Sequence, residues 1–227
     1  DNHLNRLGRG LNLIGLKSNL KKTDLLKLLN RVINKNNINS GIIRMMITRG
    51  NTDKNIYDSS GIYISIKPFY KIPKDPVKVI YMDETDYPII RFTPAIKSMN
   101  YIGNMLSKRE CKKQGGFEPV FYNKANIITE CAIRNIFYIK DNILLTPSPD
   151  LGILSGVMRD TIIEIAHNMN IDVLETHIDY NSINTMKEAF ISSTGITLLP
   201  CYWDGWKSEY KLTKLIKKEL FKRIKNN

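Results

Sequence analysis

The sequence has few of the residues that build disulfide frameworks and metal sites. It carries three cysteines and three histidines in 227 residues. The cysteines, Cys111, Cys131 and Cys201, are odd in number and widely spaced, which suits neither a disulfide framework nor a metal knuckle. We therefore predict free structural thiols and no metal site.

Long hydrophobic runs are also missing. No apolar stretch approaches the roughly 20 residues that a membrane-spanning helix needs, and the polar residues 1–9 do not resemble a secretory signal. Hydrophobic residues at 42% and charged residues at 25% match a soluble globular protein with one domain or two small ones. We expect a cytoplasmic protein without a membrane partner.

Positive charge is in excess, with a formal net charge of +12. Clustered Lys and Arg residues would indicate a nucleic-acid partner, because they release phosphate counterions on binding. Here the basic residues are spread along the chain among abundant Asn and Ile, which indicates a compositional bias. The densest cluster, residues 211–225, is typical of the solvated face of a terminal amphipathic helix. We do not expect nucleic-acid binding to be the main function.

The first third of the chain is predicted to form a small α/β domain over residues 1–67. Leucines spaced over residues 4–16 predict an opening helix, and Thr23 is the predicted N-cap of a second helix. Three prolines in the segment 68–76 favour an extended linker between domains, because proline fixes φ and removes a backbone donor. Two strands are predicted in this domain, over residues 41–48 and 61–67.

Residues 77–227 predict a larger α+β domain. Strand and helix candidates follow one another without the steady alternation of a doubly wound sheet, and no internal repeat is present. The predicted strands cover residues 77–81, 89–92, 119–122, 136–139, 143–145, 172–175, 189–192 and 196–200. The predicted helices cover residues 98–113, 157–168 and 211–225.

Several common catalytic motifs are absent, namely the P-loop, the Rossmann glycine fingerprint, the nucleophile elbow and zinc-ligand spacing. Five segments, taken together and in this order, carry a different signal: His3–Leu7, Ile96–Tyr101, Ile128–Phe137, Thr146–Arg159 and Phe190–Pro200. Together they resemble the class IV aminotransferase family of fold-type IV pyridoxal phosphate enzymes. That family includes branched-chain and D-amino acid aminotransferases and aminodeoxychorismate lyase. The resemblance covers nearly the whole chain and implies the family's two-domain α+β fold.

The resemblance implies pyridoxal 5'-phosphate as the cofactor and Lys97 as the catalytic residue. Lys97 would attach to the cofactor aldehyde and later move a proton between substrate and cofactor carbons. A lysine does this best in a partly desolvated, cation-rich pocket, which lowers its pKa. Glu130 matches the carboxylate beside the pyridine nitrogen, whose protonation improves the electron sink. Leu154 matches the residue that packs against the cofactor ring.

The same resemblance assigns the cofactor phosphate to a second group of residues. A phosphate calls for a cation and for backbone donors at a helix N-terminus. Arg6 matches the cation, and the main chain of Val157 and Met158 opens the predicted helix. Ser193 and Thr194 match a late loop that adds further donors. Met158 stands where many relatives carry threonine, so one hydroxyl contact to the phosphate is lost.

The motifs on the substrate side point in two directions. Residues 51–56 lack the Arg and His with which D-amino acid aminotransferases hold a substrate carboxylate. Residues 129–131 and 156–159 resemble some aminodeoxychorismate lyases, whereas residues 193–195 resemble the transaminases more. Candidate contacts to the cofactor or substrate are Tyr101 and Arg49. The chain begins at the family's arginine segment, so the first strands of the small domain are expected to be missing from it.

The leading hypothesis is amino-group transfer between an amino acid and a 2-oxo acid. The first alternative is aminodeoxychorismate lyase chemistry, which releases pyruvate and 4-aminobenzoate. The second alternative is a non-catalytic basic binding protein on a degenerate enzyme fold. The resemblance further implies a homodimer whose two active sites lie near the subunit interface.

Overall fold

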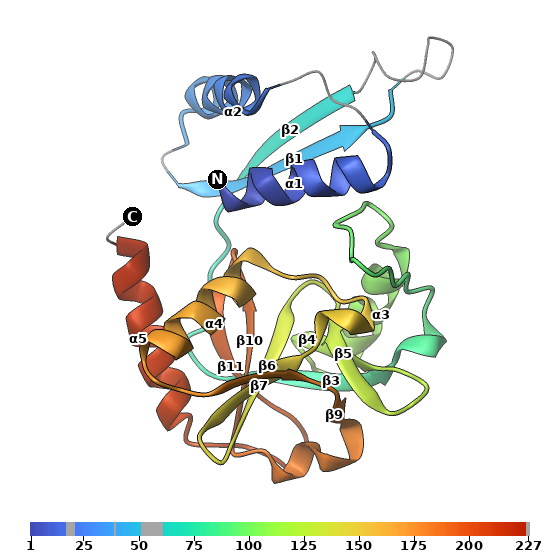
Figure 1. Cartoon of the computed structure of the whole chain (residues 1–227), viewed down its shortest axis with the longest axis vertical. Coiled ribbons are helices and arrows are strands. Elements are labelled where there is room, and N and C mark those ends of the chain that lie inside the picture. Colours follow the sequence, from blue (N-terminus) through green and yellow to red (C-terminus); the bar gives the residue numbers. More distant parts are fainter. Residues whose placement is uncertain (17–20, 39, 51–60, 226–227) are drawn as a thin grey trace. The chain divides into compact units, whose positions relative to one another are not determined.

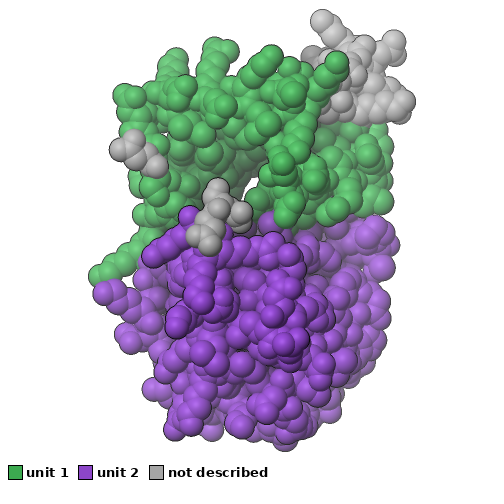
Figure 2. Space-filling model, turned by 60° about the vertical axis from the view of Figure 1, so that its left-hand side comes forward, with its two compact units in different colours: residues 1–71 green, residues 72–227 purple. Residues whose placement is uncertain are grey.

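The computed structural model describes residues 1–16, 21–38, 40–50 and 61–225. The chain forms two compact units, residues 1–71 and 72–227, shown in different colours in Figure 2. Each unit has its own secondary structure (Figure 1) and is treated separately below.

Among its described residues, the first unit contains two helices, α1 (Asn2–Leu13) and α2 (Lys22–Asn36), with Leu11 and Leu25 buried. The helix α2 begins at Lys22, with Lys21 as its N-cap, so the prediction of Thr23 as the cap is wrong. The physical reason is the Asp24 carboxylate, which accepts a hydrogen bond from the Lys21 N–H at 3.2 Å and so stabilises the earlier start.

Two strands in the described part of the first unit form an antiparallel pair. Strand β1 (Gly41–Thr48) pairs with β2 (Gly61–Pro68), so that Gly41 lies opposite Pro68 and Thr48 lies opposite Gly61. Pro68, predicted as the start of the linker, is therefore the last residue of β2, an end position at which proline is tolerated. The helix α2 packs against β2.

The described part of the second unit contains a mixed sheet of nine strands in the order β8-β7-β6-β10-β11-β3-β4-β5-β9. The pairs β7–β8, β11–β3 and β3–β4 are parallel, and the other neighbours are antiparallel. The strands are β3 (Val77–Asp83), β4 (Glu118–Tyr122), β5 (Ile127–Cys131), β6 (Asn135–Lys140), β7 (Ile143–Pro147), β8 (Val173–Thr176), β9 (Ile178–Asp179), β10 (Glu188–Ser193) and β11 (Thr197–Tyr202). The predicted α+β class is confirmed.

Three helices accompany this sheet, together with three short 3-10 segments at residues 84–86, 149–151 and 180–185. The helices are α3 (Ile102–Lys113), α4 (Val157–Asn168) and α5 (Lys211–Lys225). In the described parts of the chain, every helix falls short of the length and apolar content required for a bilayer crossing.

The central strands are buried on both faces, which explains their nearly continuous apolar sequences. In β6, Ile136 and Tyr138 belong to one core cluster, whereas Phe137 and Ile139 belong to another. This alternation follows the period of two of a strand. The second cluster lies under α4 and α5, which cover the same side of the sheet (Figure 1). The sheet is therefore packed on both faces, and the loops at the ends of its strands carry the site residues described below.

Two predictions for the segment before α3 are wrong. Residues 89–92 do not form a strand, although their apolar sequence suggested one, and Phe92 is exposed. The helix α3 begins at Ile102 rather than Ser98, because residues 96–101 form tight turns, with Ser98 N–H bonded to the Ile96 carbonyl. By contrast, α4 and α5 begin and end at the predicted residues.

An aromatic hairpin follows β11. Trp203 and Trp206 flank a turn that contains Gly205, which adopts a left-handed φ of 78°. The two indole rings stack with centroids 3.8 Å apart and an interplanar angle of 2°. Their N–H groups donate to the Asn184 side chain at 2.8 Å and to the Met186 carbonyl at 3.0 Å. The stacking of the two rings and their two hydrogen bonds together stabilise the conformation of this hairpin.

Candidate active site

Lys97 lies in the turns that connect β3 to α3. Its ammonium donates a hydrogen bond to the hydroxyl of Tyr101 at 2.7 Å and lies 5.3 Å from the centre of the Tyr101 ring. Tyr101 is also the N-cap residue of α3, so the helix fixes its position. The Lys97 side chain is exposed, so the predicted desolvation of this lysine is not seen in the second unit. The geometry therefore presents an accessible amine whose orientation Tyr101 holds.

Glu130 lies on β5 and faces the same region as Lys97. Its carboxylate forms an ion pair with Arg91 and accepts a hydrogen bond from the Leu154 N–H at 3.2 Å. Burial raises the pKa of the Glu130 carboxyl, and the Arg91 charge, the Leu154 N–H and Lys97 oppose that increase. Lys97, Glu130 and Leu154 line one hollow of about 80 Å³. An amine, a carboxylate and an apolar side chain thus converge on one small space.

Arg91 is a member of this site that the sequence analysis missed. Its guanidinium contacts Glu84 as well as Glu130, and it also lines the hollow. Arg91 falls in the segment that was predicted as a strand, 39 residues before Glu130. No local pattern marks it, because its partners come from distant parts of the sequence.

The loop between β7 and α4 is attached to the sheet through Asn135. The Asn135 amide donates to the Leu154 carbonyl at 2.8 Å. A Cβ atom at Gly156 would lie 2.2 Å from the Asn135 Oδ1 atom, so any other residue there requires the loop or the Asn135 side chain to move. Gly156 is the N-cap of α4, and the backbone N–H groups of Val157 and Met158 follow in its first turn. Such N–H groups have no acceptor within a helix and favour an anion.

The end of β10 lies beside this loop. Ser192 pairs with Asn135 in the sheet, so Ser193 and Thr194, which follow, reach the same sheet edge as the start of α4. The Ser192 hydroxyl is buried and has no hydrogen-bond partner among the described residues, as expected of a donor that a bound group would satisfy. The Met158 side chain packs against the core under α4, which leaves its backbone N–H as its polar group at the loop.

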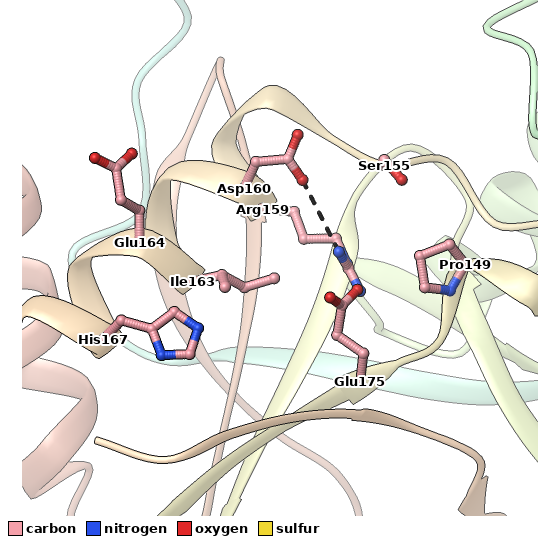
Figure 3. A pocket seen from close by; sticks show the side chains of 8 residues that line it. All are labelled: Pro149, Ser155, Arg159, Asp160, Ile163, Glu164, His167 and Glu175. Carbon is pink, nitrogen blue, oxygen red and sulfur yellow. Dashed lines mark hydrogen bonds and ion pairs between the residues drawn. The ribbon is translucent and has the colours of Figure 1, made fainter. Parts of the chain in front are cut away.

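A second and larger hollow, of about 440 Å³, contains none of the predicted site residues. It lies between α4 and β8 (Figure 3), where buried Arg159 donates to Glu175 at 2.5 Å and to the Pro147 carbonyl at 2.9 Å. Asp160 and Glu164 add two more carboxylates to its lining. We interpret this region as an ion-pair anchor for the start of α4, because Arg159 pairs with Glu175 and lies 3.9 Å from Asp160.

Some predicted residues lie in the first unit, which is described by itself. Arg6 is on α1, with a guanidinium nitrogen 3.4 Å from His3 Nδ1. Arg49 directly follows β1. The roles of both residues at the cofactor stay predictions. Residues 51–56, which were considered for substrate binding, lie outside the described residues.

Comparison with known sequences identifies related enzymes. The family model "Amino-transferase class IV" matches residues 1–202. A D-alanine aminotransferase of Listeria monocytogenes is 30% identical over 208 residues, which cover 87% of this chain and 70% of that protein. An aminodeoxychorismate lyase of Bacillus subtilis is 27% identical over 206 residues, which cover 88% of this chain and 70% of that protein.

Solved structures show the same fold. A putative 4-amino-4-deoxychorismate lyase from Legionella pneumophila superimposes with a TM-score of 0.86 at 23% identity, covering 97% of this chain and 84% of that chain. A branched-chain aminotransferase from Thermobaculum terrenum in its PLP form superimposes with a TM-score of 0.79 at 20% identity, covering 98% of this chain and 77% of that chain. These similarities confirm the fold that the sequence analysis predicted.

Proposed function

Because this chain belongs to the class IV aminotransferase family, we propose that it transfers an amino group between an amino acid and a 2-oxo acid with pyridoxal phosphate as cofactor. The main observation in support is that Lys97, Glu130 and Leu154 line one hollow. An aldehyde cofactor needs an amine, its ring nitrogen needs a carboxylate, and its ring needs an apolar surface.

The residues present fit this cofactor. Lys97 offers the amine, and Glu130 has acceptor capacity left beyond its bonds to Arg91 and Leu154. The first turn of α4 offers backbone N–H groups to a phosphate, and the buried Ser192 hydroxyl is a donor without a partner in the described chain. When bound, the cofactor supplies an electron sink for the bond that breaks at the substrate α-carbon.

The chain's own residues then move and hold protons. With the cofactor bound, Lys97 Nζ would be the base that removes the α-proton of the substrate and the acid that returns it to a neighbouring carbon. The Tyr101 hydroxyl, 2.7 Å from Nζ, keeps the amine in place between these two transfers. The Glu130 carboxylate would hold a proton on the ring nitrogen, and the N-terminus of α4 would hold the phosphate.

The test begins with cofactor binding. We expect the purified full chain to show a visible absorbance after incubation with pyridoxal phosphate, and borohydride reduction followed by peptide mapping to locate the label on Lys97. The variant Lys97→Ala should lose the label. The matched control Lys112→Ala, which removes an exposed lysine from α3, should keep it. Absence of any bound chromophore, or a label on another lysine, would contradict the proposal.

The alternative of lyase chemistry is supported by the 27% identity to the Bacillus subtilis aminodeoxychorismate lyase. A lyase needs no amino acceptor, whereas a transaminase requires a 2-oxo acid to complete its cycle. Release of pyruvate from aminodeoxychorismate without any added 2-oxo acid would therefore favour the lyase.

If the chain binds no cofactor but retains nucleic acid in a salt-dependent manner, the basic binding protein becomes the better hypothesis.

We also propose a homodimer, since apolar side chains near Lys97 are exposed. Ile102 and Met105 are 68% and 69% exposed on one face of α3, and Ile90, Phe92 and Met99 are also exposed in the preceding segment. Exposed apolar residues grouped in this way are typical of an interaction surface. We expect a dimeric mass by light scattering and a monomeric mass for a variant with Ile102→Asp and Met105→Asp. A monomeric wild-type chain would contradict the proposal.

A further inference from the structure

Arg91 bridges two carboxylates beside the hollow. Its Nε and Nη2 atoms donate to Glu84 Oε2 at 3.1 and 2.8 Å, and its Nη1 atom pairs with Glu130 Oε1. The Thr129 hydroxyl lies 3.0 Å from Arg91 Nη2 and 3.0 Å from Glu84 Oε2. One guanidinium thus connects the 3-10 segment at residues 84–86 to strand β5.

This network is mostly shielded from water. The side chains of Glu84, Arg91 and Glu130 are 15%, 19% and 17% exposed, and Thr129 is buried. Ion pairs at this depth are less screened than surface pairs, so a change of one charge has a large effect on its neighbours. The planar fork of arginine also fixes geometry, which a lysine at this position would not do.

The Glu130 carboxylate is held from two sides. Arg91 occupies one of its oxygens and the Leu154 N–H occupies the other. An ionised carboxylate accepts about four hydrogen bonds. The remaining capacity is therefore available to a donor in the hollow, while the two existing bonds prevent the group from rotating away.

We propose that Arg91 is a positioning residue that orients Glu130 toward the hollow, and that Glu84 balances its charge, so that together they set how firmly the cofactor's ring nitrogen keeps its proton. This inference rests on the proposed function. An unbalanced guanidinium beside Glu130 would disfavour a protonated ring, because like charges repel. Glu84 supplies the second negative charge that the arrangement requires.

Other charged groups also contribute to the field at Glu130, and Lys97 opposes the rise in the pKa of its carboxyl. Lys97 and Arg134 also line the hollow. The Arg134 guanidinium is paired with the fully buried Glu118 carboxylate, which Lys108 also contacts at 2.7 Å. Removal of the charge on Glu84 or Arg91 is thus the direct way to change the field at Glu130.

The two substitutions have opposite expected effects. Glu84→Gln keeps the shape of the side chain but leaves Arg91 unbalanced, so the proton affinities of Glu130 and of the ring nitrogen should fall by about tenfold. Arg91→Gln removes the cation, so the proton affinity of Glu130 should rise by a similar factor. Because orientation is lost as well, Arg91→Gln should also bind pyridoxal phosphate about tenfold more weakly.

The experiment measures protonation directly. Carbon-13 NMR follows the titration of the Glu130 carboxyl in the cofactor-free chain, and nitrogen-15 NMR follows ring-labelled pyridoxal phosphate bound to the same proteins. The control Arg109→Gln removes a cation from an exposed position on α3 and should change neither titration. Glu84→Gln serves as the decisive variant if Arg91→Gln does not fold.

The possible outcomes distinguish a failure of this inference from a failure of the proposed function. Opposite shifts in the Glu130 titration, with a lowered ring-nitrogen midpoint in Glu84→Gln, support the inference. Variants that are merely less stable, with wild-type titrations and cofactor affinity, overturn it and leave a structural ion network. A wild-type chain that binds no pyridoxal phosphate overturns the proposed function itself.

Discussion

Gly156 offers the sharpest test of the loop that precedes α4. A Cβ atom at this position would lie 2.2 Å from Asn135 Oδ1, whereas real Cβ contacts essentially never fall below 3.0 Å. Gly156→Ala therefore requires the loop or the Asn135 side chain to move by about 0.8 Å. Since the same Asn135 side chain donates to the Leu154 carbonyl, that movement breaks or weakens the bond that holds the loop.

The expected cost follows from these two contacts. Overpacking of a close contact costs about 1–3 kcal/mol, and a lost internal hydrogen bond costs about 1 kcal/mol. We expect Gly156→Ala to lower the free energy of unfolding by about 2–4 kcal/mol in urea denaturation. A shift of about 1 Å at the start of α4 should also weaken the binding of pyridoxal phosphate by tenfold or more, measured by absorbance titration.

A double-mutant cycle makes this prediction specific. Asn135→Ala removes the atom that the new methyl group meets, so Gly156→Ala should cost much less in the Asn135→Ala background than in the wild type. The control Gly8→Ala, in α1 with nothing within 4 Å of its Cβ position, should be neutral or stabilising. Wild-type stability and cofactor affinity in Gly156→Ala, or simple additivity in the cycle, would refute the reasoning.

Two further predictions concern buried groups of the second unit. Arg159→Met leaves the Pro147 carbonyl without its donor, while Glu175 becomes hydrated. This variant should lower the free energy of unfolding in urea by about 2 kcal/mol. A wild-type unfolding midpoint would contradict the anchoring role of Arg159. Burial raises the pKa of Cys111 to about 11 and raises those of Cys131 and Cys201 as well, so the three thiols should react with a thiol reagent at pH 8 only after unfolding. An unfolded thiol has a pKa of about 8.5. The stability due to Cys111 should therefore be present below about pH 8.5 and be lost as the pH rises toward 11. Unchanged stability between pH 8 and 11 would contradict this expected loss.

Local sequence patterns were sufficient to predict an element when the residues of that element alone carry the pattern. The helix α4 was predicted at its observed bounds, because apolar residues at helical spacing follow a glycine that can serve as N-cap. The strands β5 and β9 were not predicted. The short β9 has only two residues and pairs with β5, which lies far before it along the chain. Pairing of this kind has no local signature.

The candidate site could likewise be predicted only in part, because some of its contacts are created by the fold. Lys97 and Glu130 were found through the resemblance to a family, and their common hollow then appeared in the structure. Arg91 and Glu84 were not found, because their importance arises from contacts to Glu130 that only the fold creates. The apolar residues 89–92 were misread as a strand for a related reason: exposed side chains in a loop can have the composition of a buried strand.

The stacked pair Trp203 and Trp206 has an optical consequence. These are the only two tryptophans in the sequence, and both lie in the second unit. Tryptophan fluorescence and the circular dichroism of the coupled indoles therefore report on that unit alone. Unfolding of residues 1–71 is invisible to these signals, so a difference between them and the far-ultraviolet helix signal would reveal whether the two units unfold together or one at a time.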